Sequence, residues 1–279
     1  MRYRNLLLHL NTLPSCRHRV AAALDLAQRF DARIVGLAAA SMPMVAYGLD
    51  MAPAPELLAE WQTCLDELAA KATRQFEEAA RQCGVDRIES RTAGSHDLPA
   101  LMLGARYADL VIIGQPDPAE KLDDAIHLSP AEVVLGCPRP VLVVPYIGAP
   151  PGFGKTVLIA WNGSREACRA VCDALPLLEK AARVIVMAVN PQNDGIEHGD
   201  LPGADLAAYL AHHGVNVEVH ADPGASVSVG EELLSRIADL NVDLLVMGAY
   251  GHTRAREWVF GGVTRTILNS MTVPVLMSH

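Results

Sequence analysis

Short apolar runs alternate with longer amphipathic stretches along the whole chain. Two series of strand, helix and strand share the same order: residues 5–11, 18–30 and 33–38 near the amino terminus, and 157–161, 167–180 and 183–189 beyond the middle of the chain. The runs are rich in Val, Ile and Leu and are not strictly alternating, which is typical of strands that are buried on both faces. The pattern therefore predicts parallel sheets covered by helices on both faces.

The two series belong to an internal repeat. At an offset of 151 residues Asn11 matches Asn162 and Leu24 matches Leu175, whereas residues 108–114 match residues 242–248 at an offset of 134. The first copy must therefore be about 17 residues longer than the second. We place this extra length in the Pro- and Met-rich stretch 41–55, which precedes an amphipathic helix over 56–83 and could be a loop, a lid or a partner surface.

The stretch 145–154 is dense in Pro and Gly and poor in residues that could form a core, so it reads as a linker between the copies. The predicted domains are residues 1–147 and 155–279. Each is predicted to be an α/β domain with an open, Rossmann-like sheet of five parallel strands and helices on both faces.

Residues 149–156 imitate a phosphate-binding loop, with Gly154, Lys155 and Thr156 at the end of a loose motif. A working loop of this kind opens a helix, whose free N–H groups hold the anion. Here Lys155 and Thr156 run into the strand 157–161 instead, and Pro150 and Pro151 provide no N–H donors. We therefore interpret this motif as part of the linker.

A second glycine-rich stretch lies where an open parallel sheet binds its ligands. Gly248 and Gly251 follow the buried strand 244–247, and Gly261 and Gly262 come nine residues after Gly251. Glycines at the carboxyl end of a strand let the backbone turn sharply and approach a pyrophosphate. The helix that begins near Thr264 would point its N-terminal N–H groups at an anion, with His252, Arg254 and Arg256 nearby to bind it.

The spacing Gly-x-x-Gly-x9-Gly after a strand resembles the nucleotide loop of the universal stress protein family, in its ATP-binding branch. The resemblance implies a stress-response protein whose second domain binds ATP, ADP or AMP, with Mg²⁺ as a companion ion. It also implies that the two copies pack as an internal pseudo-dimer through their last strands, Val141–Val144 and Val273–Met277, which would bury two edge strands. It places these residues around the nucleotide: Gly248, Gly251, Gly261, Gly262 and Val263 at the ribose and phosphates, and Asn162 and the backbone near Val189 at the ribose and adenine.

Two residues depart from the family pattern, and the first copy departs further. The family usually has Asp where this chain has Asn162, and Ser or Thr where it has Gly262; Thr264 is the candidate to replace the missing hydroxyl. In the first copy Gly251 becomes Asp117 and Gly261 becomes His127. Asp117 would repel phosphate, so we expect the first domain to be structural and to bind no nucleotide triphosphate.

Charge and composition exclude several other functions. The net charge is −9 without a basic stripe, so nucleic acid is not an expected partner. No apolar stretch is long enough to span a membrane and no leader follows Met1, which favours the cytoplasm. No metal-ligand spacing and no catalytic triad can be read, and the six cysteines are expected to be buried reduced thiols.

These observations favour a regulatory nucleotide-binding protein that does not turn over a substrate, although slow ATP hydrolysis stays open. The chief alternative is a nucleotide-free adaptor that docks a protein partner through the segment 41–55 and the helix after it. A third is an enzyme of the wider adenine nucleotide α-hydrolase-like superfamily. A homodimer of the whole chain also stays open.

Overall fold

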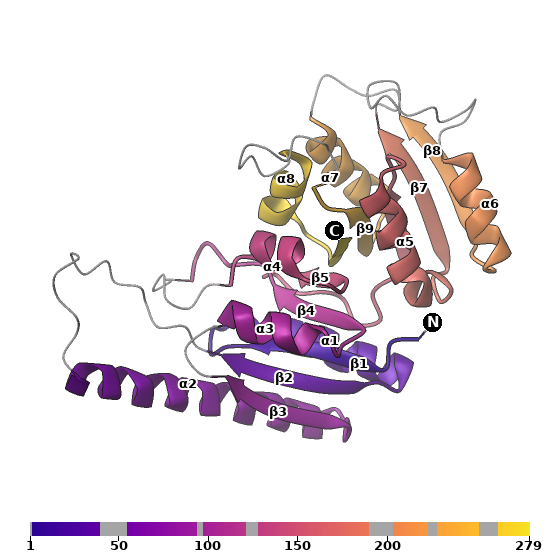
Figure 1. Cartoon of the computed structure of the whole chain (residues 1–279). Helices are drawn as coiled ribbons and strands as arrows, with labels where there is room; N and C mark the ends of the chain where they lie inside the picture. Colours follow the sequence, from indigo (N-terminus) through magenta and orange to yellow (C-terminus); the bar gives the residue numbers. More distant parts are fainter. Residues whose placement is uncertain are drawn as a thin grey trace.

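The computed structural model describes residues 2–39, 55–93, 97–120, 128–189, 203–222, 228–250 and 262–279 (Figure 1). The described strands form one sheet of ten, in the order β3-β2-β1-β4-β5-β10-β9-β6-β7-β8. The strands of the first half of the chain are β1 (Asn5–Leu10), β2 (Arg33–Ala39), β3 (Ile88–Ala93), β4 (Leu110–Gly114) and β5 (Val141–Val144). Those of the second half are β6 (Thr156–Ala160), β7 (Arg183–Val189), β8 (Val217–Asp222), β9 (Leu244–Gly248) and β10 (Val275–Ser278).

Helices cover both faces of this sheet, and each half contributes four of those that the structure describes. The first half contains α1 (Cys16–Phe30), α2 (Pro55–Gln82), α3 (Asp97–Ala105) and α4 (Pro130–Gly136). The second contains α5 (Arg165–Leu178), α6 (Ala204–His212), α7 (Val229–Asp239) and α8 (Gly262–Ser270). The α/β class with five parallel strands in each half is thus the fold that the sequence predicts.

The two halves meet at their last strands. β5 and β10 pair in antiparallel register, with Leu142 opposite Leu276, whereas the strand pairs within each half are parallel. The predicted pairing of these strands is confirmed, and it makes one continuous sheet out of two. Because each of these strands is covered by a neighbour on both sides, neither leaves an open edge at the junction.

The side chains of β5 show how the core continues across this junction. Val141 and Val143 belong to the apolar cluster under α3, α4, α7 and α8, whereas Leu142 and Val144 belong to the cluster under α1, α2, α5 and α6. This alternation follows from the two-residue period of a strand. Both clusters contain residues from both halves of the chain, so the halves share their core.

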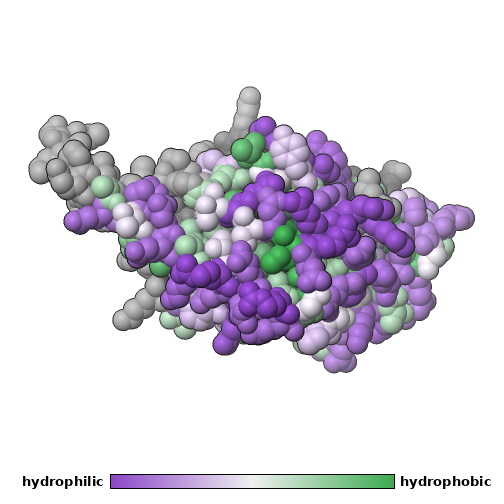
Figure 2. Space-filling view, turned by 90° about the horizontal axis from the view of Figure 1, so that it is seen from below, coloured by the Kyte–Doolittle hydropathy of each residue, from purple (hydrophilic) through white to green (hydrophobic). Residues whose placement is uncertain are grey.

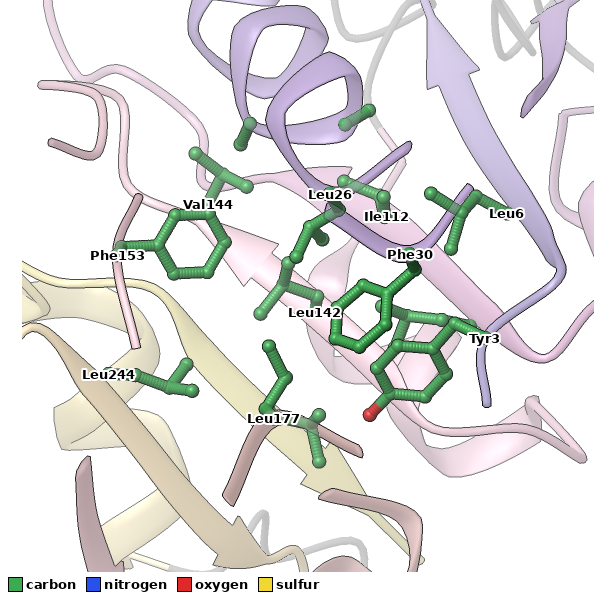
Figure 3. Packing of buried hydrophobic residues seen from close by; sticks show 14 of the residues in the cluster. Tyr3, Leu6, Leu26, Phe30, Ile112, Leu142, Val144, Phe153, Leu177 and Leu244 are labelled. Atoms are coloured by element: carbon green, nitrogen blue, oxygen red, sulfur yellow. The ribbon is translucent and has the colours of Figure 1, made fainter. Parts of the chain in front are cut away.

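The stretch between the halves contributes more to the core than its composition predicts. Phe153 is 1 % exposed and packs with Val144, Leu177 and Leu244 in the apolar cluster (Figure 3). Its carbonyl accepts a hydrogen bond from Arg29 of α1 at 2.6 Å. The prediction of a linker that is poor in core-forming residues is therefore wrong at Phe153, while the domain boundary at residues 148–154 stays a prediction.

The extra length of the first half lies mainly in a helix. α2 has 28 residues and its counterpart α6 has 9. The stretches 40–54 and 190–202, which lie outside the described residues, are of similar length to each other. The placement of the extra length in residues 41–55 is therefore wrong, because α2 carries most of it. Of the described helices, none combines the length and the hydropathy needed to cross a bilayer.

Candidate functional site

The candidate site lies where the chain reverses its direction of travel across the second half of the sheet. β6 has β7 on one side and β9 on the other, with Ala160 opposite Met247 in the register. In open α/β sheets, ligands bind at such a switch point, outside the carboxyl ends of the strands. Asn162 follows β6, Val189 ends β7 and Gly248 ends β9, so the structure brings these three predicted site residues to one edge of the sheet.

Asn162 shapes the turn that leads from β6 into α5. Its side-chain Oδ1 accepts a hydrogen bond from the backbone N–H of Ser164 at 3.1 Å, and Gly163 between them has φ 68°. In the first half, Asn11 accepts the same bond from Leu13 at 3.2 Å. The oxygen of Asn162 thus holds its own turn, and the amide Nδ2 is the donor that the side chain can offer a ligand.

Gly248 is required by the packing of α5. A Cβ atom added at Gly248 would lie 2.4 Å from the backbone nitrogen of Ala167 and 2.6 Å from the carbonyl carbon of Glu166. Both atoms are main chain in the first turn of α5 and cannot move aside as a flexible side chain could. Only glycine lets β9 and α5 approach this closely, so close packing of α5 is sufficient to explain Gly248.

The amino terminus of α8 supplies the second part of the site. Gly262, Val263 and Thr264 form its first turn, whose N–H groups have no carbonyl partner within the helix. A Cβ atom at Gly262 would meet nothing within 4 Å of the described atoms. Thr264 is 3 % exposed. Packing does not require a glycine at position 262, unlike at Gly248, and the first turn is open to a ligand there.

Four predicted site residues, Gly251, His252, Arg254 and Gly261, lie outside the described residues, within 251–261. Their assignment to the nucleotide therefore stays a prediction. The described chain delimits this loop on both sides, with Tyr250 before it and Gly262 after it.

His279 contacts Ala249 and Tyr250, which precede the segment 251–261. The sequence analysis missed this contact. Tyr250 has φ 60°, in the left-handed region, and its ring meets that of His279 edge to face with centroids 6.1 Å apart. Nδ1 of His279 also lies 2.9 Å from the carbonyl oxygen of Ala249. The only signal in the sequence was the position of Tyr250 between two glycines.

Glu166 is a further residue that the sequence analysis missed. It lies in the first turn of α5 beside Gly248, is 6 % exposed, and pairs with Arg165 at 2.9 Å. Burial raises its pKa, but its backbone hydrogen bond and the charges of Arg165 and His279 outweigh this and hold the pKa below its ordinary value. An ionised carboxylate therefore lies beside the candidate site.

The motif that imitates a phosphate loop is occupied by the protein itself. The backbone N–H groups of Gly154, Lys155 and Thr156 all donate to the carboxylate of Asp243, at 3.0, 3.1 and 3.0 Å. Lys155 directly precedes β6, whose first residue is Thr156. The interpretation of this stretch as a linker is consistent with these bonds, because the N–H groups that would hold a phosphate already have an anionic partner.

The corresponding edge of the first half is filled by side chains. Arg19 is 4 % exposed, and its Nε donates to the carbonyl oxygen of His9 at 2.7 Å. A Cβ atom at Gly114 would lie 2.7 Å from Nη1 of Arg19, so the guanidinium is packed against the end of β4. At the offset of 151 its counterpart is Ala170, which has no such group. The remaining cavity, lined by His9, Arg19, Gln115 and neighbours, has about 20 Å³, room for about one water molecule.

A carboxylate occupies the helix terminus on this side. Glu120 accepts hydrogen bonds from the backbone N–H and the hydroxyl of Ser15, the residue before α1, at 2.7 and 2.8 Å. Asp117 begins the turn to Glu120 and accepts a bond from the N–H of Ala119 at 2.8 Å. An anion at a helix N-terminus is favourable, and here the chain provides its own. His127 lies outside the described residues.

The part of the chain that the structure describes bears on the predictions about metal ligands and cysteines. It contains no group of three or more His, Cys, Asp and Glu side chains that could hold a metal ion. Cys16 and Cys137 are buried, whereas Cys64, Cys83, Cys168 and Cys172 are exposed. The prediction of buried thiols is therefore wrong for these four.

An open parallel sheet with glycines and a helix N-terminus at its switch point defines the class of Rossmann-like α/β proteins. Residues 154–279 match the model of the universal stress protein family. The chain is 29% identical to the universal stress protein Slr1230 of Synechocystis over 176 residues, which are 60% of this chain and 57% of that protein. The alignment thus spans little more than half the length of this curated relative.

Solved structures share the fold over the full length of the chain. A universal stress protein from Archaeoglobus fulgidus superposes with a TM-score of 0.72 at 18% identity, covering 99% of this chain and 96% of that one. A putative universal stress protein from Pseudomonas aeruginosa gives 0.59 at 17% identity, covering 99% and 93%. These likenesses show the fold, and the match to the universal stress protein family covers residues 154–279.

Proposed function

We propose that the protein is a stress-response regulator that binds ATP or a related adenine nucleotide through its second half. The observation that carries the proposal is the convergence of Asn162, Gly248 and the open first turn of α8 at one switch point. N–H groups and a helix dipole favour phosphate there, and the predicted glycine loop 251–261 connects the parts. ADP and AMP are alternative ligands, and Mg²⁺ would accompany the phosphates.

We propose further that binding is regulatory and not catalytic. Glu166 is the carboxylate beside Gly248, and its pKa is lowered, so it is ionised at neutral pH and a weak general base. Its charge suits it better to Mg²⁺ or to a helix terminus than to proton abstraction. Slow hydrolysis would leave this proposal intact, whereas rapid steady-state turnover of ATP would contradict it.

The test is a calorimetric titration of the wild-type chain with ATP and Mg²⁺, repeated with GTP. Both nucleotides carry the same phosphates, so a preference for ATP reports a pocket for adenine and not a site for any polyphosphate. We expect saturable ATP binding, weaker GTP binding and a rise in the thermal midpoint. At a hundredfold excess of nucleotide over Kd, binding should raise the free energy of unfolding by about 2.7 kcal/mol. Absence of binding would reject the proposal.

The second candidate is a nucleotide-free adaptor, which the length of α2 favours. α2 is 28 residues long, and its amino-terminal part extends beyond the strands that it covers (Figure 1). Figure 2 shows the molecule from the side on which α2 lies, and hydrophilic residues dominate that surface while hydrophobic ones form only small groups. A partner bound there would use polar contacts. Recovery of a protein partner that is lost on deletion of residues 41–64, without nucleotide binding, would favour this function.

The predictions of a cytoplasmic location and of a homodimer belong to the proposal as well. A monomer in analytical ultracentrifugation would exclude the homodimer. The antiparallel pairing of β5 with β10 would then join the two copies within one chain in place of a dimer of chains.

A further inference from the structure

Gln115, directly after β4 in the first half, donates two hydrogen bonds to the second half. Its Nε2 donates to the carbonyl oxygens of Leu268 and Asn269, at 2.9 and 3.1 Å, and its Oε1 accepts from the N–H of Tyr146 at 3.3 Å. The residue is 4 % exposed. A buried side chain of the first half therefore donates to the end of a helix of the second half.

The two carbonyl groups belong to the last turn of α8. The last four carbonyls of a helix have no partner within it, and buried ones need a donor from elsewhere. Gln115 supplies that donor to two of them. α8 has 9 residues and is roughly 13 Å long, so its carboxyl end is held by the first half while its amino end faces the candidate nucleotide site.

The second half has no residue equivalent to Gln115 that could hold the end of α4. At the offset of 134, Gln115 corresponds to Ala249, and both make the same backbone bond to the neighbouring strand, from Gln115 N to Val144 O at 2.8 Å and from Ala249 N to Ser278 O at 2.9 Å. Alanine has no side-chain donor, so Ala249 cannot hold the end of α4 as Gln115 holds the end of α8. The contact runs in one direction, from the first half to α8.

We infer that Gln115 is a positioning residue of the nucleotide site: it anchors α8 from the first half, so that the first turn of α8 meets the phosphates in a fixed place. This inference rests on the proposed function. It gives the first half a role beyond covering an edge strand. Gln115 also lines the small cavity beside Arg19 and Gly114. A rearrangement of that cavity would therefore act on α8 through this side chain.

The test is the variant Gln115→Met, which keeps the length of the side chain and removes its donor. We expect peptides of α8 to exchange backbone amides about tenfold faster and the Kd for ATP with Mg²⁺ to rise about fivefold or more, since the loss of one or two kcal/mol corresponds to a factor of 5–30. Peptides of α5, in the same half, serve as the internal reference. A merely structural role would speed exchange in α5 and α8 alike.

Gln28→Met is the matched control. Gln28 of α1 also donates from Nε2 to a carbonyl at a helix end, that of Cys83 directly after α2, at 2.7 Å. Gln28 is exposed, and its bond lies within the first half. It should change neither α8 nor the Kd. If Gln115→Met does not fold, the side-chain amide resonances of Gln115 in the ¹⁵N-labelled wild type replace it, and they should shift on nucleotide binding while those of Gln28 do not.

The outcomes separate the two proposals. Nucleotide binding by the wild type with an unchanged Kd and unchanged α8 exchange in Gln115→Met overturns the role of Gln115 alone. Unmoved Gln115 resonances at saturating nucleotide do the same. Absence of binding by the wild type overturns the proposed function and this role with it.

Discussion

The same edge of the sheet is treated differently in the two halves of the chain. In the second half, Gly248 admits the backbone of α5, Ala170 stands at the position of Arg19, and a Cβ atom at Gly262 would meet no described atom within 4 Å. In the first half, Arg19 packs against Gly114 and Glu120 occupies the amino end of α1. The described residues of the two copies therefore differ at the switch point: charged side chains pack there in the first half, and glycine and alanine stand at the matching positions in the second half.

The largest expected difference between the halves concerns the glycine that ends the fourth strand of each. Gly248→Ala places a Cβ 2.4 Å from a main-chain nitrogen, so we expect it to destabilise the protein by about 3 kcal/mol or more. Gly114→Ala meets the end of the Arg19 side chain, which can shift, so its cost should be about 1 kcal/mol. Chemical denaturation of both variants measures the contrast, and equal costs would show that the two glycines are equivalent.

The buried polar groups of the first half predict a dependence of stability on pH. Burial, and second the charge of Arg19, lower the pKa of His9 to about 3, so the imidazole is neutral in the folded protein and only 4.0 Å from the carboxylate of Asp97. In the unfolded chain His9 titrates near pH 6.5, so below that pH the unfolded state binds more protons. Stability from this group is complete above pH 6.5 and is lost as the pH falls toward 3, by on the order of a few kcal/mol.

The variant His9→Gln isolates this contribution. The free energy of unfolding of the wild type relative to that of the variant should be highest above pH 6.5 and should fall as the pH drops toward 3. A difference that does not change with pH would mean that His9 titrates alike in both states.

A smaller effect is expected at Gly262, in the open half. Gly262→Ser adds the hydroxyl that the family resemblance leads one to expect, into space where no described atom lies within 4 Å. One added hydrogen bond to phosphate should tighten ATP binding several-fold, about 1 kcal/mol, with little change in stability. Isothermal titration measures it, and unchanged affinity would indicate that this first turn does not contact phosphate.

The sequence was sufficient for the elements because their cause is local. The Val-rich run 183–189 is strand β7 within the same bounds, and the family resemblance predicted which strands join the halves. Asp109 and Asp243 directly precede the fourth strand of their halves, β4 and β9. They accept bonds from the N–H groups of Asn5 and Thr156, at 2.9 and 3.0 Å.

The sequence was insufficient where contacts join distant residues. Arg19 is part of an ordinary helical pattern, and nothing near it in the chain shows that its guanidinium lies against Gly114. Gln115 is separated from Leu268 by 153 residues, and its counterpart in the repeat, Ala249, has no side-chain amide. Phe153 lies among prolines and glycines, and its burial depends on α1 and β9 meeting around it.

The most direct test of the asymmetry between the halves is the stoichiometry of ATP binding with Mg²⁺ to the wild type and to the double variant Gly251→Asp, Gly261→His, which gives the second half the residues of the first. The account predicts one nucleotide per chain for the wild type, and none for a double variant whose circular dichroism is that of the folded protein. Two nucleotides per wild-type chain, or undiminished binding by the double variant, would contradict it.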